Sequence, residues 1–183
     1  MDSIALARFV EARPWMIERL AVVAAHGPRG AWIGAGFLRN AVWDVLSGCD
    51  PQDVPPADLD VVHHDPAQAS AAHDAVFEAA LTAAAPGLPW SVTNQARMHG
   101  RNGHAPYRDL VDALAHWPET ATAIAARLRD GAVEILAPHG VADLFALVAR
   151  PTGGDAGAMH ARIAAKGWRD RWPMLRVLRP YGR

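Results

Sequence analysis

The sequence predicts an α/β or α+β fold, in which helices pack on one sheet. Helical spacing of apolar residues alternates along the chain with short β-branched runs, and clusters of Gly and Pro separate these segments. Of the 183 residues, 51% are hydrophobic and 20% are charged, so the chain can bury a substantial core. The length suits one compact domain.

The first part of the chain is expected to form helix, strand and helix. Apolar residues recur at helical spacing over 3–26, with a break at Pro14. A Gly- and Pro-rich cluster at 26–30 ends this segment. A short apolar strand over 31–36 and a helix over 37–48 follow.

The rest of the chain continues this alternation. Residues 58–64 form a β-branched strand, 66–85 an alanine-rich helix, and 89–99 a further strand. The later expectations are a polar loop at 100–109, a helix at 110–117, a strand pair at 120–128 and 133–138, helices at 140–149 and 158–171, and a loop at 151–157. We therefore expect a single domain over 1–183, with sheet and helices in 1–139 and a helical C-terminal part in 140–183.

The composition excludes several classes of protein. A net charge of −1 argues against a molecule built as a whole to bind nucleic acid or an anionic membrane. The single cysteine, Cys49, cannot form an internal disulfide, which fits a reducing compartment. The N-terminus lacks a signal-peptide pattern, and no apolar run has the roughly 20 residues of a membrane span. We expect a cytoplasmic protein with no membrane association.

Two acids, Asp58 and Asp60, stand at the start of the strand in the segment "DLDVV". Residues i and i+2 of a strand point to the same face, so both carboxylates can converge on one point. Two carboxylates this close repel each other, and a divalent cation such as Mg²⁺ relieves the repulsion. The alternative is that both are solvated acids or turn caps, which the tripeptide alone does not exclude.

A glycine turn, "GAG", lies between the preceding strand and helix. Backbone N–H groups at such a helix start favour an anion, and Gly34 and Gly36 let a phosphate approach closely. Arg39 lies one turn into the helix and can add a charge-assisted hydrogen bond. Alternatively, the glycines only permit tight packing and Arg39 is a surface cation. Turn and acid pair together are more specific than either alone.

The segments "GAGFLRN" and "DLDVV" resemble the signature of the DNA polymerase β-like nucleotidyltransferase superfamily, in the style of the CCA-adding and poly(A) polymerase catalytic heads. Ala35 and Gly36 match its glycine pair, and Leu38 and Arg39 match its "VR". Asn40 stands where that signature has Asp. The resemblance implies that Gly34, Ala35, Gly36, Arg39 and Asn40 bind the nucleotide.

Nearly the whole chain is similar to a group of small bacterial nucleotidyltransferase family proteins. The shared segments include "WIGAGFLRNAVWDVL", "DLDVVHHD", "WSVTNQARMH", "WPETATAIAARL", "APHGVADLF" and "KGWRDRWPML". The resemblance implies an α+β, polymerase β-like fold with a small mixed sheet flanked by helices. It also implies transfer of a nucleotidyl group from an NTP to an unassigned hydroxyl acceptor, with Mg²⁺ or Mn²⁺ held by the catalytic residues Asp58 and Asp60.

The expected third carboxylate of that superfamily is not evident. The matching strand "WSVTNQARMH" offers Asn94 and Gln95 in its place, and Asn94 is the expected contact to the nucleotide or metal. Asp112 and Glu119 are further acids that the sequence does not place. An enzyme and a non-catalytic nucleotide-binding or interaction module on the same fold therefore both stay open, as does the oligomeric state.

The C-terminal segment is basic. Residues 161–183 carry seven Lys or Arg residues against one acid, Asp170. This charge could attract a triphosphate or RNA, but the solvated face of a terminal helix is the preferred interpretation. The seven tryptophans of the chain are expected mainly in the core.

Overall fold

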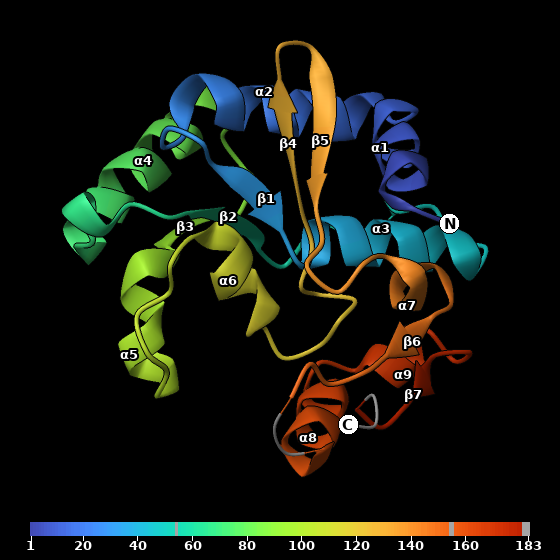
Figure 1. The fold of residues 1–183 in the computed structure, drawn as a ribbon. Helices are drawn as coiled ribbons and strands as arrows, with labels where there is room; N and C mark the ends of the chain where they lie inside the picture. Colours follow the sequence, from blue (N-terminus) through green and yellow to red (C-terminus); the bar gives the residue numbers. More distant parts are fainter. Residues whose placement is uncertain (54, 154–155, 181–183) are drawn as a thin grey trace.

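The computed structural model describes residues 1–53, 55–153 and 156–180 (Figure 1). Its centre is a five-stranded sheet with the strand order β3-β2-β1-β4-β5. The strands are β1 Trp32–Gly34, β2 Leu59–His63, β3 Trp90–Asn94, β4 Ala125–Arg129 and β5 Ala132–Leu136. The β2–β3 pair is parallel and the other pairs are antiparallel, so the sheet is mixed and the expected α+β fold is confirmed.

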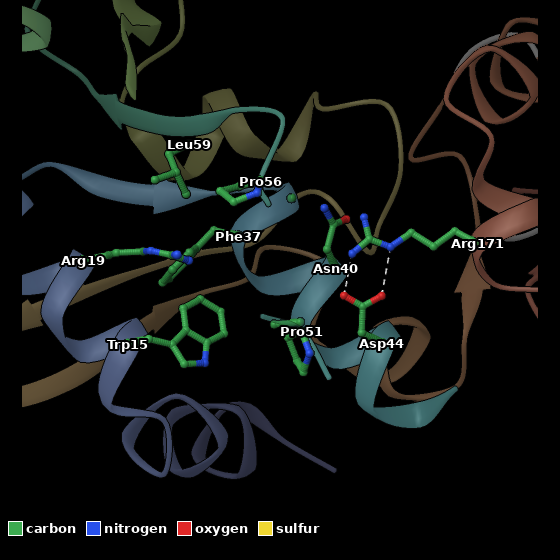
Figure 2. A pocket seen from close by; sticks show the side chains of 11 residues that line it. Trp15, Arg19, Phe37, Asn40, Asp44, Pro51, Pro56, Leu59 and Arg171 are labelled. Atoms are coloured by element: carbon green, nitrogen blue, oxygen red, sulfur yellow. Dashed lines mark hydrogen bonds and ion pairs between the residues drawn. The ribbon is translucent and has the colours of Figure 1, made fainter. Parts of the chain in front are cut away.

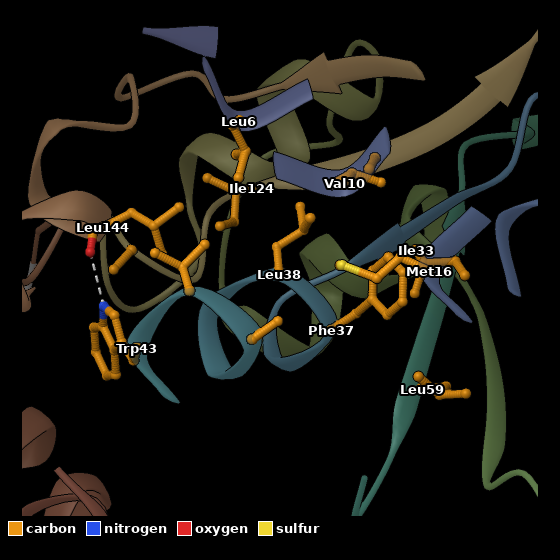
Figure 3. Packing of buried hydrophobic residues seen from close by; sticks show 14 of the residues in the cluster. Leu6, Val10, Met16, Ile33, Phe37, Leu38, Trp43, Leu59, Ile124 and Leu144 are labelled. Carbon is orange, nitrogen blue, oxygen red and sulfur yellow. Dashed lines mark hydrogen bonds between the residues drawn. The ribbon is translucent and has the colours of Figure 1, made fainter. Parts of the chain in front are cut away.

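One face of the sheet packs against the main helices. These are α1 Ser3–Glu11, α2 Pro14–His26, α3 Gly36–Leu46 and α4 Ala71–Ala84. Their buried side chains form one cluster with Ile33, Leu59 and Val61 of the sheet, part of which is drawn in Figure 3. The break at Pro14 is confirmed, because proline occupies the first turn of α2, where no N–H partner is needed.

The opposite face carries a smaller apolar cluster. Leu110 and Leu114 of α6, Leu110–Ala115, pack with Val62 of β2 and Trp32 of β1. The alternation of side chains along β2 therefore sends Leu59 and Val61 to the main core and Val62 to this second face. Asp60 shares the parity of Val62, so it also belongs to the second face.

Several boundaries differ from those expected. The strand expected to run to residue 99 ends at Asn94, because the Asn94 side chain accepts from Ala96 N–H and starts the 3-10 turn η2 Gln95–Arg97. The short helix α5 Met98–Asn102 follows, where a loop was expected. The helix expected from residue 66 begins as a separate turn, η1 Pro66–Gln68, and Ser70 then caps α4.

The C-terminal part also differs from the sequence prediction. It contains α7 Ala142–Phe145, β6 Val148–Ala149, α8 Ala156–Ala165, α9 Trp168–Arg171 and β7 Arg176–Val177. The helix expected over 140–149 is one short turn followed by β6, which pairs in parallel with β7. The last expected helix is divided at Gly167, whose φ of +60° is a conformation that glycine adopts without strain.

Helix α3 anchors the C-terminal part. The Asp44 carboxylate accepts a hydrogen bond from Arg171 Nη2 at 2.7 Å (Figure 2). It accepts another from Trp172 Nε1 at 2.8 Å. The Trp43 indole is fully buried and donates to the Leu144 carbonyl at 2.9 Å (Figure 3). The helix that begins at the glycine turn thus also fixes the position of α9. None of the helices in the described ranges is long and apolar enough to cross a membrane.

Candidate functional site

The turn between β1 and α3 has an unusual backbone at Ala35. Its φ of 48° and ψ of −115° lie where glycine is normally found. The Ala35 N–H donates to the Ile124 carbonyl at 3.0 Å, and its own carbonyl accepts from Arg39 N–H at 3.0 Å. No side chain caps the start of α3. The first turn of α3 therefore offers backbone N–H groups and the positive end of its dipole to an anion.

The two glycines of the turn have different roles. A Cβ atom on Gly34 would lie 2.9 Å from Cη2 of Trp117, so glycine is needed there for packing. A Cβ atom on Gly36 would lie 3.4 Å from Asn40 Nδ2, 3.6 Å from Arg39 Nη2 and 3.7 Å from Asp58 Oδ1. An amide, a guanidinium and a carboxylate thus converge beside Gly36.

Asp58 and Asp60 meet this turn from β2. Asp58 is exposed and precedes the strand, whereas Asp60 lies within it and is partly buried. Burial and the neighbouring charge of Asp58 raise the pKa of the Asp60 carboxyl, and the cations Lys166, Arg39 and Arg162 oppose the rise. The repulsion expected from the sequence is therefore present in the fold, and a bound divalent cation would remove it.

Arg39 is a buried cation and not a surface residue. Its side chain donates from Nη2 to Asn40 Oδ1 at 2.8 Å, and its guanidinium carbon lies 4.2 Å from the centroid of the Trp168 ring. Burial lowers the pKa of Arg39 to about 10, against the attraction of the Glu119 charge. Arg39 therefore stays protonated at neutral pH and places a fixed positive charge beneath the acid pair.

A hollow opens beside Asp60 on the second face of the sheet. Its lining comes from the turn, β2, β3, η2, α5, the segment before β4, and α8. The lining residues are Ala35, Asp60, Val62, Thr93, Gln95, Met98, Asn102, Trp117, Pro118, Thr122 and Arg162. The neighbouring residue Gly36 lines a second pocket with Asn40 and Asp44 (Figure 2). The turn thus separates two concave surfaces.

The candidates for a third ligand are engaged elsewhere. The Asn94 side chain is fully buried, and its amide makes four hydrogen bonds, two accepted from Asp65 and Ala96 N–H and two donated to the Asp65 and Gln68 carbonyls. This fills its hydrogen-bonding capacity. The Asn94 side chain therefore stabilises the turn after β3, and its amide has no hydrogen-bonding group left for a nucleotide.

The two further acids also have partners. Asp112 pairs with Arg108 at the start of α6. Glu119 is completely buried; it accepts from Thr122 Oγ1 at 2.8 Å and lies 2.9 Å from Arg162 Nε. Among the described residues, no group of three or more His, Cys, Asp or Glu side chains is arranged to hold a metal ion. Two carboxylates are the acidic ligands that the site offers.

Sequence reasoning missed most residues of the hollow, and three of them have clear structural roles. Trp117 covers Gly34, Thr122 binds Glu119, and Arg162 joins the hollow from α8. None belongs to a local pattern, because each comes from a segment distant in sequence from the acid pair. The basic composition of residues 161–183 was the one signal that included Arg162.

A family model described as nucleotidyltransferase matches residues 22–177. The chain belongs to this nucleotidyltransferase family. The match contains the glycine turn, the acid pair and the C-terminal helices, and it confirms the family resemblance drawn from the sequence. A comparison with curated proteins finds no match.

Solved structures confirm the fold of this nucleotidyltransferase. An NMR structure described as a CCA-adding enzyme head domain is 28% identical, with a TM-score of 0.81, and the match covers 95% of this chain and 94% of that chain. A CCA-adding enzyme with CTP (15% identity, TM-score 0.57) matches 97% of this chain and 43% of its own. The Thermotoga maritima CCA-adding enzyme complexed with tRNA is 16% identical, with a TM-score of 0.57, and the match covers 97% of this chain and 42% of that chain. The chain therefore spans less than half the length of these two enzymes.

Proposed function

We propose that this protein transfers a nucleotidyl group from an NTP to a hydroxyl acceptor, with Mg²⁺ or Mn²⁺ held by Asp58 and Asp60. The observation that carries the proposal is the convergence of Asp58, Arg39 and Asn40 beside Gly36, next to the uncapped start of α3. Family membership supports transferase chemistry. Structures of the same fold described with CTP and with ATP support an NTP as the substrate.

The donor set fits a hard cation. Asp58 and Asp60 supply carboxylate oxygens, the ligands that Mg²⁺ prefers, and phosphate oxygens and water complete such a site. When bound, the metal ion neutralises triphosphate charge and lowers the pKa of the attacking hydroxyl. The raised pKa of Asp60 supports the same conclusion, because burial and the charge of Asp58 disfavour the ionised carboxylate and a bound cation would favour it.

The chain itself contributes mainly position and charge, as is general for this chemistry. The start of α3 orients the triphosphate through backbone N–H groups, and Arg39 adds positive charge from beneath. The acceptor oxygen forms a bond to the α-phosphorus while the bond from the α-phosphorus to the bridging oxygen breaks. Pyrophosphate leaves with that electron pair, and the hydroxyl proton passes to solvent.

A non-catalytic nucleotide-binding module is the second candidate. The observation that favours it is the lack of a further carboxylate: Asp60 is the one acid among the described residues that line the hollow. Glu119 and Asp112 are held by Arg162 and Arg108. Such a module would bind ATP with Mg²⁺ but would transfer no label to an acceptor.

Two measurements test the proposal. ATP with Mg²⁺ should raise the melting temperature, since a ligand that binds the native state at 100 times its Kd adds about 2.7 kcal/mol. Incubation with labelled NTPs, Mg²⁺ or Mn²⁺ and cell extract should transfer label to an acceptor, and Asp60→Ala should abolish the transfer. Stabilisation without transfer would favour the binding module. If millimolar nucleotide leaves the melting temperature unchanged, nucleotide binding itself is ruled out.

A further inference from the structure

The C-terminal helix α8 brings positive charge to the hollow that contains Asp60. Arg162 of α8 lines this hollow together with Asp60 and Thr122. Its side chain keeps 36% of its surface exposed, although its Nε lies 2.9 Å from the fully buried Glu119 carboxylate. One edge of the guanidinium is therefore held by the protein, and part of the group stays accessible to a ligand.

Packing fixes the direction of this arginine. One oxygen of the Glu119 carboxylate accepts a hydrogen bond from Thr122 Oγ1, and the other oxygen forms an ion pair with Arg162. The guanidinium carbon of Arg162 lies 5.9 Å from the Trp168 centroid, and Arg39 stacks on the same indole at 4.2 Å. Trp168 in turn packs edge-on against Trp43 of α3. The helix that starts at the phosphate-binding turn thus positions α8 as well.

Lys166 extends the charged edge of α8. Its N–H donates to the Arg162 carbonyl at 3.0 Å, so the two side chains are one helical turn apart on the same face. Lys166 is exposed, and among the residues that the structure describes it has no ion-pair partner. Its charge reaches Asp60, where it opposes the rise in pKa of that carboxyl.

Pairing with buried acids explains Arg162 but does not explain Lys166. Glu119 needs one positive partner, and Arg162 supplies it. Lys166 forms no ion pair with a described acid, and it lies one helical turn from Arg162, which lines the hollow. Arg39, Arg162 and Lys166 balance the charges of Asp58, Asp60 and Glu119, so metal ions bound by the two aspartates would leave the site with a net positive charge. A triphosphate is a ligand that fits such a site.

We propose that Arg162 and Lys166 bind the β- and γ-phosphates of the NTP and hold the pyrophosphate that leaves. This assignment rests on the proposed function. Charge accumulates on the pyrophosphate when the bond from the α-phosphorus to the bridging oxygen breaks, so cations at this position stabilise the leaving group. The basic C-terminal part therefore contributes a cation to the same hollow that the glycine turn lines through Ala35.

The test compares ligands with and without the terminal phosphates. Binding of ATP, AMP and inorganic pyrophosphate, each with Mg²⁺, is measured by calorimetry on the full chain. Lys166→Ala should weaken the binding of ATP and of pyrophosphate about tenfold, because one charge-assisted contact is lost. The affinity for AMP should stay unchanged. Arg169→Ala is the matched control, because Arg169 is an exposed cation that lines a different hollow with His160 and Ile163.

Arg162 requires a variant that keeps the fold. The double variant Glu119→Gln, Arg162→Gln removes both charges, so that no buried carboxylate is left without a partner. It should also weaken the binding of ATP and of pyrophosphate about tenfold and leave the affinity for AMP unchanged. Pyrophosphate binding by Lys166→Ala as tight as that of the unchanged protein would overturn the assignment. Failure of the unchanged protein to bind ATP or pyrophosphate would overturn the proposed function as well.

Discussion

The metal-binding role proposed for Asp60 carries a cost in the stability of the metal-free protein. Because burial and the charge of Asp58 raise its pKa, folding favours the protonated carboxyl. A raised folded-state pKa gives stability that is present below the unfolded pKa and is lost as pH rises through the folded pKa. At neutral pH the ionised side chain is therefore a destabilising group until a cation binds.

We predict that Asp60→Asn melts at a higher temperature than the unchanged protein at pH 7 without divalent ions. The difference should shrink as the pH falls through the pKa of Asp60, because the natural side chain then also becomes neutral. Mg²⁺ should raise the melting temperature of the natural protein and not that of the variant. Asp53→Asn, in an exposed loop, is the control. Equal melting temperatures at pH 7 would contradict this account of Asp60.

Local pattern predicted part of the site at this scale. Asp58, Asp60, Gly36 and Arg39 stand in one stretch of chain, and the fold brings Asp58 and Arg39 beside Gly36, as the pattern indicates. Arg162 and Trp117 could not be found in this way, because only the folded chain brings α8 and the segment before β4 to the strand. Asn94 was assigned to the nucleotide by its place after β3, whereas its amide is consumed by four local hydrogen bonds.

At the scale of elements, α3 connects the glycine turn to the C-terminal helices. Asp44 is 3% exposed and holds both Arg171 and the Trp172 indole. Removal of the carboxylate leaves a partly buried guanidinium and a buried N–H without their acceptor, and both groups lose hydrogen bonds that water cannot fully replace.

We predict that Asp44→Ala lowers the free energy of unfolding by about 3 kcal/mol, the usual cost of breaking a buried ion pair. Urea denaturation measures the change. Asp170→Ala, at an exposed position on α9, should alter stability little. A loss below about 1 kcal/mol for Asp44→Ala would show that this pair does not anchor the C-terminal part.

Sequence patterns located the helices α1, α2, α3 and α4 and the five strands of the sheet, although several bounds shifted. The period of apolar residues marks the helices because they bury side chains in the main cluster, whereas the strands stand out as apolar or β-branched runs between turn residues. The pair β6 and β7 has two residues per strand, too few for any period to register. The division between α8 and α9 depends on the positive φ angle of Gly167. The pattern of apolar residues continues through this position, so it does not reveal the break.

At the scale of the whole molecule, the sheet and the C-terminal part share buried surface. Trp43 is fully buried, with its ring centroid 5.5 Å from that of Trp168 and 5.0 Å from that of Trp172. Glu119 precedes β4 but is paired with Arg162 of α8. These contacts support the proposal that residues 1–183 fold as one cooperative unit.

We therefore predict that a chain ending at residue 139 loses cooperative unfolding. It would expose Trp43 and leave the buried Glu119 without its cation, so apolar surface and an unpaired charge appear together. Calorimetry should show a broad transition, and binding of a hydrophobic dye should increase relative to the full chain. A sharp, two-state transition in the shortened chain would instead indicate that residues 1–139 form an independent domain.

The tryptophan cluster gives the molecule an optical property of its own. Trp43, Trp168 and Trp172 meet edge to face, and the Arg39 charge beneath the acid pair rests on one of these rings. Indole emission responds to the local electric field, and coupled rings produce strong near-ultraviolet circular dichroism. Occupation of the cavity should therefore be visible in the intrinsic spectra, without any attached dye.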